Sequence, residues 1–149
     1  MNAVTNVYEG RCHCGAIGYV LHTEKPPAKW TLRSCQCSFC RSHGSKNMAD
    51  PSGSVVFRIA DASKLIRYRF ASRSLEFLVC AGCGGYIGAV HASPRGQWAT
   101  LNTNVLPAMP ELPQSIPFVA DDAPVAEKQA GREQRWTPVT AGLTAVCGS

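Results

Sequence analysis

The sequence predicts a mainly β protein of small antiparallel sheets, with one short helix near the C-terminus. Three observations predict this class. Short apolar runs interrupted by polar residues recur between residues 16 and 103, which is typical of half-buried strands. Glycine, proline, serine and asparagine separate these runs, as they do at turns. One later stretch, residues 121–136, has the length and composition of a helix.

The first two strands are expected on either side of a proline break. Residues 16–23, AIGYVLHT, alternate loosely between apolar and polar side chains. KPP at 25–27 ends this run, because proline cannot continue a ladder of hydrogen bonds. Residues 30–35, WTLRSC, are the second strand and lead into a cluster of cysteines. Residues 41–54 are rich in Gly, Ser, Asn and Pro and are expected to form a long loop.

The remaining strands follow this loop in close succession. They are expected at residues 55–60, 65–70, 75–80, 85–92 and 98–103. Four prolines between 107 and 117 make residues 106–118 a stiff crossing without regular structure. The helical tail at 121–136 has Asp122 as its expected N-cap and Pro124 in its first turn.

The length of the chain is that of one domain. With 149 residues it can bury one core but not two full-sized ones, so we expect a single domain over residues 1–149. No apolar run approaches the roughly 18 residues of a membrane span. The N-terminal MNAVTNVYEG lacks the basic and apolar regions of a secretory signal. We therefore expect a cytoplasmic protein without a membrane partner.

The chain contains eight cysteines, a number that fits either a disulfide framework or metal binding. Without an export signal the thiols are expected to stay reduced, and dense cysteines in a reducing compartment indicate metal or redox ligands. Their C-x-C and C-x-x-C spacings also make bridging within a pair difficult. Metal binding is the favoured interpretation, and disulfides or redox-active thiols are the alternatives.

Two of the cysteine motifs combine into one set of four thiolates. GRCHCG at 10–15 and CAGCGG at 80–85 each place two cysteines at the end of an expected strand, with glycines that let the backbone approach a metal. Four cysteines are the usual ligands of a closed structural zinc site. The predicted ligands are Cys12, Cys14, Cys80 and Cys83. A redox-active C-x-x-C at 80–83 is disfavoured, because no thioredoxin-like pattern surrounds it.

A third motif, SCQCSFC at 34–40, supplies only three thiolates. They are Cys35, Cys37 and Cys40. The chain offers three candidates for the fourth ligand: Cys147 near the chain end, His43 three residues after Cys40, and His13, which lies between Cys12 and Cys14 and is expected to project away from their metal. The alternative is a position that the protein leaves open for water or substrate. The open site is favoured, with Cys147 as a free terminal thiol. An open three-thiolate zinc can bind an incoming thiol as thiolate and admit a second reactant.

The formal net charge of +5 first suggests a nucleic-acid partner. Seven thiolates and two Zn²⁺ add −7 + 4 = −3, which leaves the zinc-loaded protein near about +2. The sequence also has no basic stripe interleaved with aromatic residues, since Trp30, Trp98 and Trp136 are scattered. We therefore expect no nucleic-acid partner, whereas a small anionic ligand is compatible with this charge.

The order C-x-C, C-x-C-x-x-C, C-x-x-C-G resembles that of the glutathione-dependent formaldehyde-activating enzyme family, which includes centromere protein V. The matching stretches are GRCHCG, CQCSFCRSHG and FLVCAGCG, and the similarity runs from about residue 8 to 105. REQRWTPV also resembles the tail of bacterial members. The resemblance implies a β-tent fold, in which small antiparallel sheets are held together by zinc. It also implies a structural zinc on the four-cysteine set and a second zinc on the three-cysteine set.

In this family the second zinc is associated with binding glutathione and with forming or cleaving S-hydroxymethylglutathione, a carbon–sulfur lyase reaction. The resemblance therefore implies glutathione and a small aldehyde as partners, with Cys35, Cys37 and Cys40 as the catalytic zinc ligands. This chain is shorter than the best-known members, and its segment HGSKNMADPSGS differs from theirs. The alternative is a non-catalytic, zinc-stabilised binding module.

A few charged residues near these motifs are candidates for binding glutathione. Arg41 directly follows the cysteine cluster, and His43 lies two residues further and titrates near neutral pH. Both are therefore expected at the substrate, with His43 as a candidate proton shuttle. The alternative for His43 is a loop residue without a role in binding. Arg67 and Arg69 alternate with apolar residues in LIRYRF, so they are interpreted as a solvated strand face. His91 lies within an expected strand and is interpreted as structural.

Overall fold

The computed structural model describes residues 6–70, 74–118 and 124–141, and in them it confirms the mainly β class. The strands are β1 (Asn6–Arg11), β2 (Ile17–Thr23), β3 (Arg33–Cys35), β4 (Asn47–Met48), β5 (Ser54–Ile59), β6 (Leu65–Tyr68), β7 (Glu76–Cys80), β8 (Tyr86–Ser93), β9 (Gly96–Asn102), β10 (Ile116–Phe118) and β11 (Thr137–Ala141). The α-helices are α1 (Ser38–His43) and α2 (Val125–Arg135). Asp122 and Cys147 lie outside the described residues.

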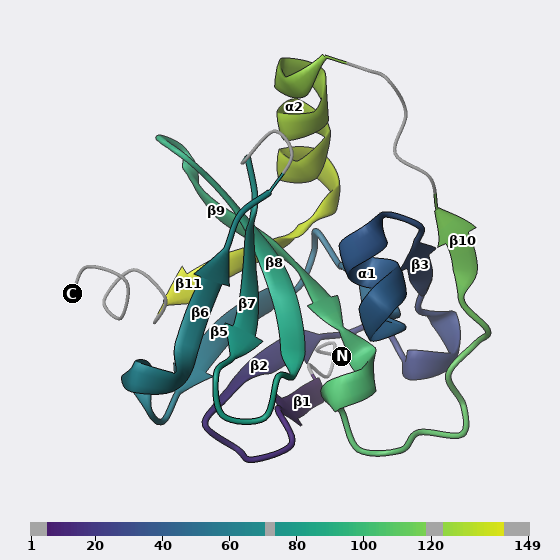
Figure 1. The fold of residues 1–149 in the computed structure, drawn as a ribbon. Coiled ribbons are helices and arrows are strands. Elements are labelled where there is room, and N and C mark those ends of the chain that lie inside the picture. Colours follow the sequence, from purple (N-terminus) through teal and green to yellow (C-terminus); the bar gives the residue numbers. More distant parts are fainter. Residues whose placement is uncertain (1–5, 71–73, 119–123, 142–149) are drawn as a thin grey trace.

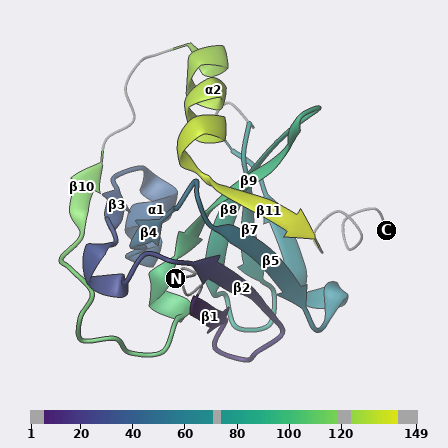
Figure 2. The ribbon, with the colours of Figure 1, turned by 180° about the vertical axis from the view of Figure 1, so that it is seen from behind.

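The strands form one connected network with two layers. Its main path runs β1-β2-β5-β11-β9-β4-β3-β10, and β8, β7 and β6 continue from β9. Figure 1 shows β6, β7 and β8 in front of β2 and β5, and the view from behind in Figure 2 reverses this order. The pairing of β11 with β9 joins the two layers.

The main core lies between these two layers. Alternate side chains of β2 and β5 pack against those of β7, β8 and β9. The most deeply buried aliphatic residues are Ile17, Leu21, Val55, Leu78, Ile87 and Leu101. Each buried side chain of this size contributes roughly 1.5–3 kcal/mol relative to its exposure to water. The period-two alternation of the strands therefore accounts for the two-layer arrangement.

The sheet is not purely antiparallel, which corrects the sequence prediction. β10 pairs with β3 in parallel, and β11 pairs with β5 in parallel. Strands joined by short turns run antiparallel, whereas parallel neighbours need a long connection. Both β10 and β11 return from distant parts of the chain, so their direction is not visible in a local pattern. β1 and β11 were also not among the expected strands.

The long loop predicted at residues 41–54 is partly structured. It contains the end of α1 and the short strand β4. The helix begins after Cys37, whose Sγ accepts a hydrogen bond from the Cys40 amide at 3.3 Å. It ends at Gly44, which has a φ of 58°. A glycine in this left-handed conformation commonly terminates a helix.

The crossing predicted to lack regular structure at 106–118 ends in a strand. Ile116 donates its amide to the Leu32 carbonyl at 2.7 Å, and β10 then pairs with β3 although it contains Pro117. β10 is the last strand on its path. Proline is tolerated at such an edge, because its missing N–H leaves no internal ladder position unsatisfied.

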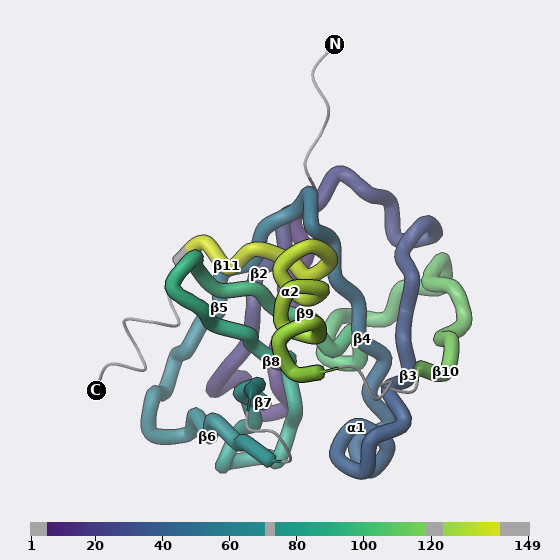
Figure 3. The backbone as a smooth tube through the Cα atoms, turned by 90° about the horizontal axis from the view of Figure 1, so that it is seen from above, coloured from purple at the N-terminus to yellow at the C-terminus, as the bar shows by residue number. Residues whose placement is uncertain are grey.

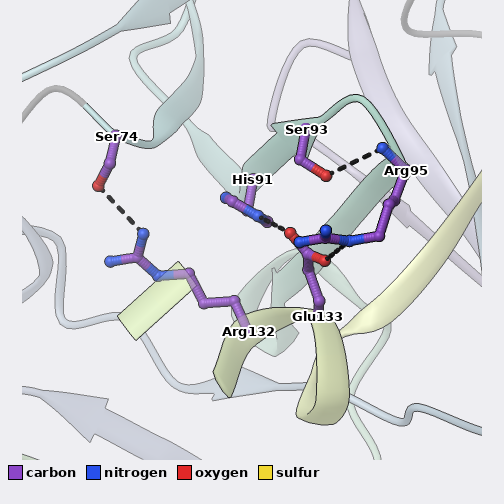
Figure 4. Close-up of polar contacts among 6 residues, drawn as sticks. All are labelled: Ser74, His91, Ser93, Arg95, Arg132 and Glu133. Atoms are coloured by element: carbon purple, nitrogen blue, oxygen red, sulfur yellow. Dashed lines mark hydrogen bonds and ion pairs between the residues drawn. The ribbon is translucent and has the colours of Figure 1, made fainter. Parts of the chain in front are cut away.

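The C-terminal helix predicted from the sequence is confirmed as α2. Pro124 is its N-cap residue and not part of its first turn. Glu133 fixes the helix on the sheet by accepting hydrogen bonds from Arg95 Nε at 2.6 Å and from His91 Nε2 at 2.8 Å (Figure 4). These bonds, with that of Arg95 the larger influence, lower the pKa of Glu133 to about 2. The view from above shows α2 lying over β8 and β9 (Figure 3).

Candidate metal centres and the adjoining cavity

Four cysteine sulfurs converge where the β1–β2 and β7–β8 turns meet. The Sγ atoms of Cys12, Cys14, Cys80 and Cys83 all lie within 4.8 Å of one another. Cys14 Sγ is 3.8 Å from Cys12 Sγ and 3.5 Å from Cys80 Sγ. Sulfurs at the corners of a tetrahedron 2.3 Å from a central zinc are separated by about 3.8 Å. The four-cysteine cluster therefore has the donor set and the spacing of a tetrahedral metal site.

Glycines make the close approach of these two turns feasible. Gly15 and Gly84 have φ values of 81° and 80°, which residues with a Cβ rarely adopt. A Cβ on Gly85 would lie 3.1 Å from Cys12 Cβ. Backbone amides also point at the sulfurs, since Ile17 N lies 3.4 Å from Cys12 Sγ. Such N–H groups stabilise thiolate ligands in a metal site.

The second cluster lies at the junction of β3 and α1. Cys35 ends the strand, Cys37 caps the helix and Cys40 is buried in its first turn, with the three Sγ atoms within 4.8 Å of one another. A hydrogen bond from Cys40 lowers the pKa of Cys35 to about 5. The same contact raises the pKa of Cys40. Thiolate is the metal-binding form of cysteine, and the hydrogen bond from Cys40 stabilises it on Cys35.

No fourth Cys, His, Asp or Glu joins this three-cysteine cluster in the part of the chain that the structure describes. His43 lies at the other end of α1, where its Nδ1 is 3.0 Å from the Phe39 carbonyl oxygen. Its ring packs on Phe39 with centroids 4.4 Å apart. Cys147, the other candidate from the sequence, lies outside the described residues.

A cavity of about 570 Å³ adjoins the three-cysteine cluster, and all three cysteines line it. This volume is in the range of small-molecule binding sites. Its apolar wall includes Phe70, Leu75, Phe77, Tyr86, Ala89 and Trp136. Its cationic residues are Arg33, Lys128, Arg132 and Arg135. A ligand that fits both walls would be small, partly apolar and negatively charged.

Two cavity-lining residues carry buried polar atoms without a hydrogen-bond partner among the described residues. They are the hydroxyl of Tyr86, a side chain that is 2% exposed, and Oδ1 of Asn47. Asn47 Nδ2 lies 4.0 Å from Cys40 Sγ, which places this side chain beside the thiols. Leaving a buried polar group unsatisfied costs roughly 1–3 kcal/mol. Such groups are suited to a ligand that brings its own polar atoms.

The three arginines considered in the sequence analysis differ in their exposure and in their contacts. Arg41 is exposed on α1 and is not among the residues that line the cavity. Arg67 forms an ion pair with the largely buried carboxylate of Glu76 and is itself only 29% exposed. It is therefore not the fully solvated side chain expected from the alternation. Arg69, which is 48% exposed, lies 3.4 Å from the same carboxylate.

The sequence interpretation missed the cations of α2. Lys128, Arg132 and Arg135 are spaced i, i+4 and i+7, which places them on one side of a helix. This spacing was a readable signal, but it does not say which surface the helix contacts. In the structure this side faces the cavity beside the three-cysteine cluster.

These features define a class of mainly β proteins with two cysteine clusters that can hold metal ions, in which one cluster lies beside a ligand-sized cavity. Within it, a profile of the glutathione-dependent formaldehyde-activating enzyme family matches residues 7–116. The match covers more than half of the chain, and the chain therefore belongs to this family. The predicted resemblance is confirmed.

The crystal structure of a Rhodobacter sphaeroides protein has a similar fold. The two chains are 26% identical, with a TM-score of 0.57, and the similarity covers 75% of this chain and 99% of the other. No curated protein matches the chain. In the described residues no helix is both long and apolar enough to cross a membrane.

Proposed function

We propose that the protein is a zinc-dependent carbon–sulfur lyase that forms or cleaves the adduct of glutathione, or a similar thiol, with a small aldehyde. S-hydroxymethylglutathione is the adduct that the family name suggests. One observation carries the proposal: a three-cysteine cluster, which no further protein ligand joins among the described residues, adjoins a cavity of about 570 Å³. Catalytic zinc sites have three protein ligands and one position for water or substrate.

The two clusters have different roles in this proposal. The four-cysteine cluster holds a structural zinc, because its ligands complete a tetrahedron. Cys35, Cys37 and Cys40 hold the reactive zinc. When bound there, zinc supplies the Lewis acidity that keeps an incoming thiol in its thiolate form at neutral pH.

The reaction forms or breaks one carbon–sulfur bond. The thiol sulfur adds to the carbonyl carbon, and the proton lost by the thiol ends on the carbonyl oxygen, so that the adduct is a hemithioacetal. The reverse reaction returns the free thiol and aldehyde. Phe77, Leu75 and Trp136 line the cavity beside the thiols and exclude water from the reacting atoms, which strengthens polar interactions there.

The Tyr86 hydroxyl is the group suited to hold the aldehyde oxygen. It is buried, has no hydrogen-bond partner among the described residues and belongs to a side chain that lines the cavity. Burial, and after it the negative charge of the three nearby thiols, raises the pKa of this hydroxyl. A donor of this kind stabilises negative charge as it develops on the oxygen. The apolar ring contacts around it, including Phe39 with a centroid distance of 5.1 Å, hold the phenol in place.

Replacing Tyr86 with phenylalanine is therefore expected to lower kcat by roughly a hundredfold, the usual effect of removing one such donor. KM for the thiol and the zinc content should change little, because the ring and the cysteines remain. Tyr68→Phe is the matched control, since Tyr68 stacks on Phe39 but is 46% exposed and does not line the cavity. An unchanged kcat in Tyr86→Phe would contradict this role.

The function itself is tested on the zinc-loaded protein. Native mass spectrometry should count two zinc ions and detect a complex with glutathione. NMR exchange between glutathione, formaldehyde and their adduct should then be faster than the spontaneous background. Two zinc ions that are indifferent to glutathione, with exchange at the background rate, would exclude the proposed activity and support the binding module instead.

A further inference from the structure

The cavity beside the three-cysteine cluster has a strong excess of positive charge on one side. Its lining contains four cationic side chains and, among the described residues, one carboxylate, that of Glu127. Three of the four cations, Lys128, Arg132 and Arg135, belong to α2, and Arg33 comes from β3. Helix α2 lies beyond residues 7–116, which the family profile matches. The three cations of α2 are therefore a property of this chain that the family match does not cover.

Arg132 is the most informative of these cations. Its Nη1 donates to Ser74 Oγ at 3.0 Å, and its guanidinium carbon lies 5.7 Å from the centre of the Trp136 ring (Figure 4 shows the first contact). Burial lowers the pKa of Arg132. No carboxylate among the described residues forms an ion pair with it. A guanidinium has five N–H donors, so most of its hydrogen-bonding capacity is available to a ligand.

The neighbouring residue on α2 fixes the position of Arg132. Figure 4 shows the two side chains leaving the helix in different directions, Arg132 toward Ser74 and Glu133 toward His91 and Arg95. The Glu133 carboxylate is only 10% exposed and binds both of these partners. Glu133 thus anchors α2 on β8, and Arg132 is held at the cavity before any ligand arrives. Such preorganisation reduces the entropic cost of binding.

We propose that this wall of α2 is a carboxylate-binding subsite, with Arg132 as its principal contact and Lys128 and Arg135 in support. It selects anionic thiols over neutral ones at the three-cysteine cluster. A carboxylate is the matching ligand, because its two oxygens can accept two parallel N–H bonds from one guanidinium. The selectivity rests on the proposed function, whereas the carboxylate site itself does not.

The test uses two probes on the zinc-loaded protein. S-methylglutathione keeps the carboxylates of glutathione but has no free thiol, and 2-mercaptoethanol is a neutral thiol without a carboxylate. In isothermal calorimetry, Arg132→Gln should weaken S-methylglutathione binding at least roughly tenfold, as expected for the loss of a charge-assisted hydrogen bond. 2-Mercaptoethanol binding should stay within about twofold of the wild type, because the thiol site is untouched and this probe carries no charge.

The control variant is Arg58→Gln, which removes the same charge from β5. Arg58 is 67% exposed and contacts only the Glu9 carboxylate among its described ion pairs. It should bind both probes like the wild type. Arg132→Lys keeps the charge without the guanidinium fork, so it should fall between the wild type and Arg132→Gln. Circular dichroism should show that each variant is folded.

Each outcome decides the proposal. Unchanged S-methylglutathione binding in Arg132→Gln would overturn it, and so would equal losses for both probes, since a carboxylate subsite leaves the neutral 2-mercaptoethanol unaffected. If Arg58→Gln weakened S-methylglutathione binding as much as Arg132→Gln does, the effect would come from the net charge of the protein and not from a specific site. That result would also overturn the proposal. In a further outcome, the wild type fails to catalyse adduct formation while Arg132→Gln still binds S-methylglutathione more weakly than the wild type. That result would support the carboxylate subsite and contradict the proposed activity.

Discussion

Replacing Cys80 with serine is expected to remove one zinc ion and to unfold most of the protein. Cys80 is 1% exposed, and its Sγ lies 3.5 Å from that of Cys14, 66 positions away in the sequence. The site therefore ties the β1–β2 turn to the β7–β8 turn across most of the fold. Structural zinc contributes roughly 10–16 kcal/mol in small zinc domains, whereas the net stability of a domain is only about 5–15 kcal/mol.

Zinc stoichiometry by native mass spectrometry and the urea midpoint by circular dichroism measure this effect together. The stoichiometry should fall from two toward one or none, and the midpoint should fall or the transition should disappear. Ala81→Ser is the matched control, because it places a hydroxyl at the next, exposed position of the same turn. If Cys80→Ser kept both zinc ions and the wild-type midpoint, the four-cysteine cluster would not be the structural site.

The sequence was informative about the fold where the relevant signal is local. The strand at 54–59 was predictable because buried and less buried side chains alternate along it. The strand at 17–23 is buried on both faces, and it was predictable as a short, mostly apolar run that ends at turn residues. The parallel pairing of β11 with β5 depends on where the chain returns after α2, and no local pattern encodes that. Helix α1 has only six residues, which is too few to show a helical period. The sequence interpretation therefore relied on composition and assigned the end of this helix to a loop.

The same distinction applies to the site. The thiol clusters were predictable because metal ligands occur in closely spaced pairs, and the structure brings each predicted set together. The cationic wall of the cavity was not predictable from the sequence, because it depends on the contacts that hold α2 on the sheet. Arg132 lies at the cavity because Glu133 binds His91 and Arg95. Substrate contacts by Arg41 and His43 stay predictions. Their positions on α1, outside the cavity lining, make the α2 cations the better candidates for holding a carboxylate.

Replacing Cys37 with serine is expected to abolish turnover while leaving the fold largely intact. The variant loses one of three thiolates at the proposed reactive zinc, so the zinc count should fall from two toward one and kcat by at least roughly a hundredfold. The fold should survive, because Cys37 also caps α1 by accepting the Cys40 amide at 3.3 Å, and serine is among the preferred N-cap residues. Steady-state kinetics, zinc stoichiometry and the thermal midpoint measure the three effects.

Cys37→Ala separates the cap from the metal ligand. Alanine removes both, so this variant should be as inactive as Cys37→Ser but less stable by about 0.5–2 kcal/mol, the usual cost of losing an N-cap. A serine variant with wild-type turnover would show that Cys37 is not a ligand of the reactive zinc. A serine variant that unfolds like Cys80→Ser would instead make the second cluster structural, because only a zinc that holds the fold together makes its ligands indispensable for folding.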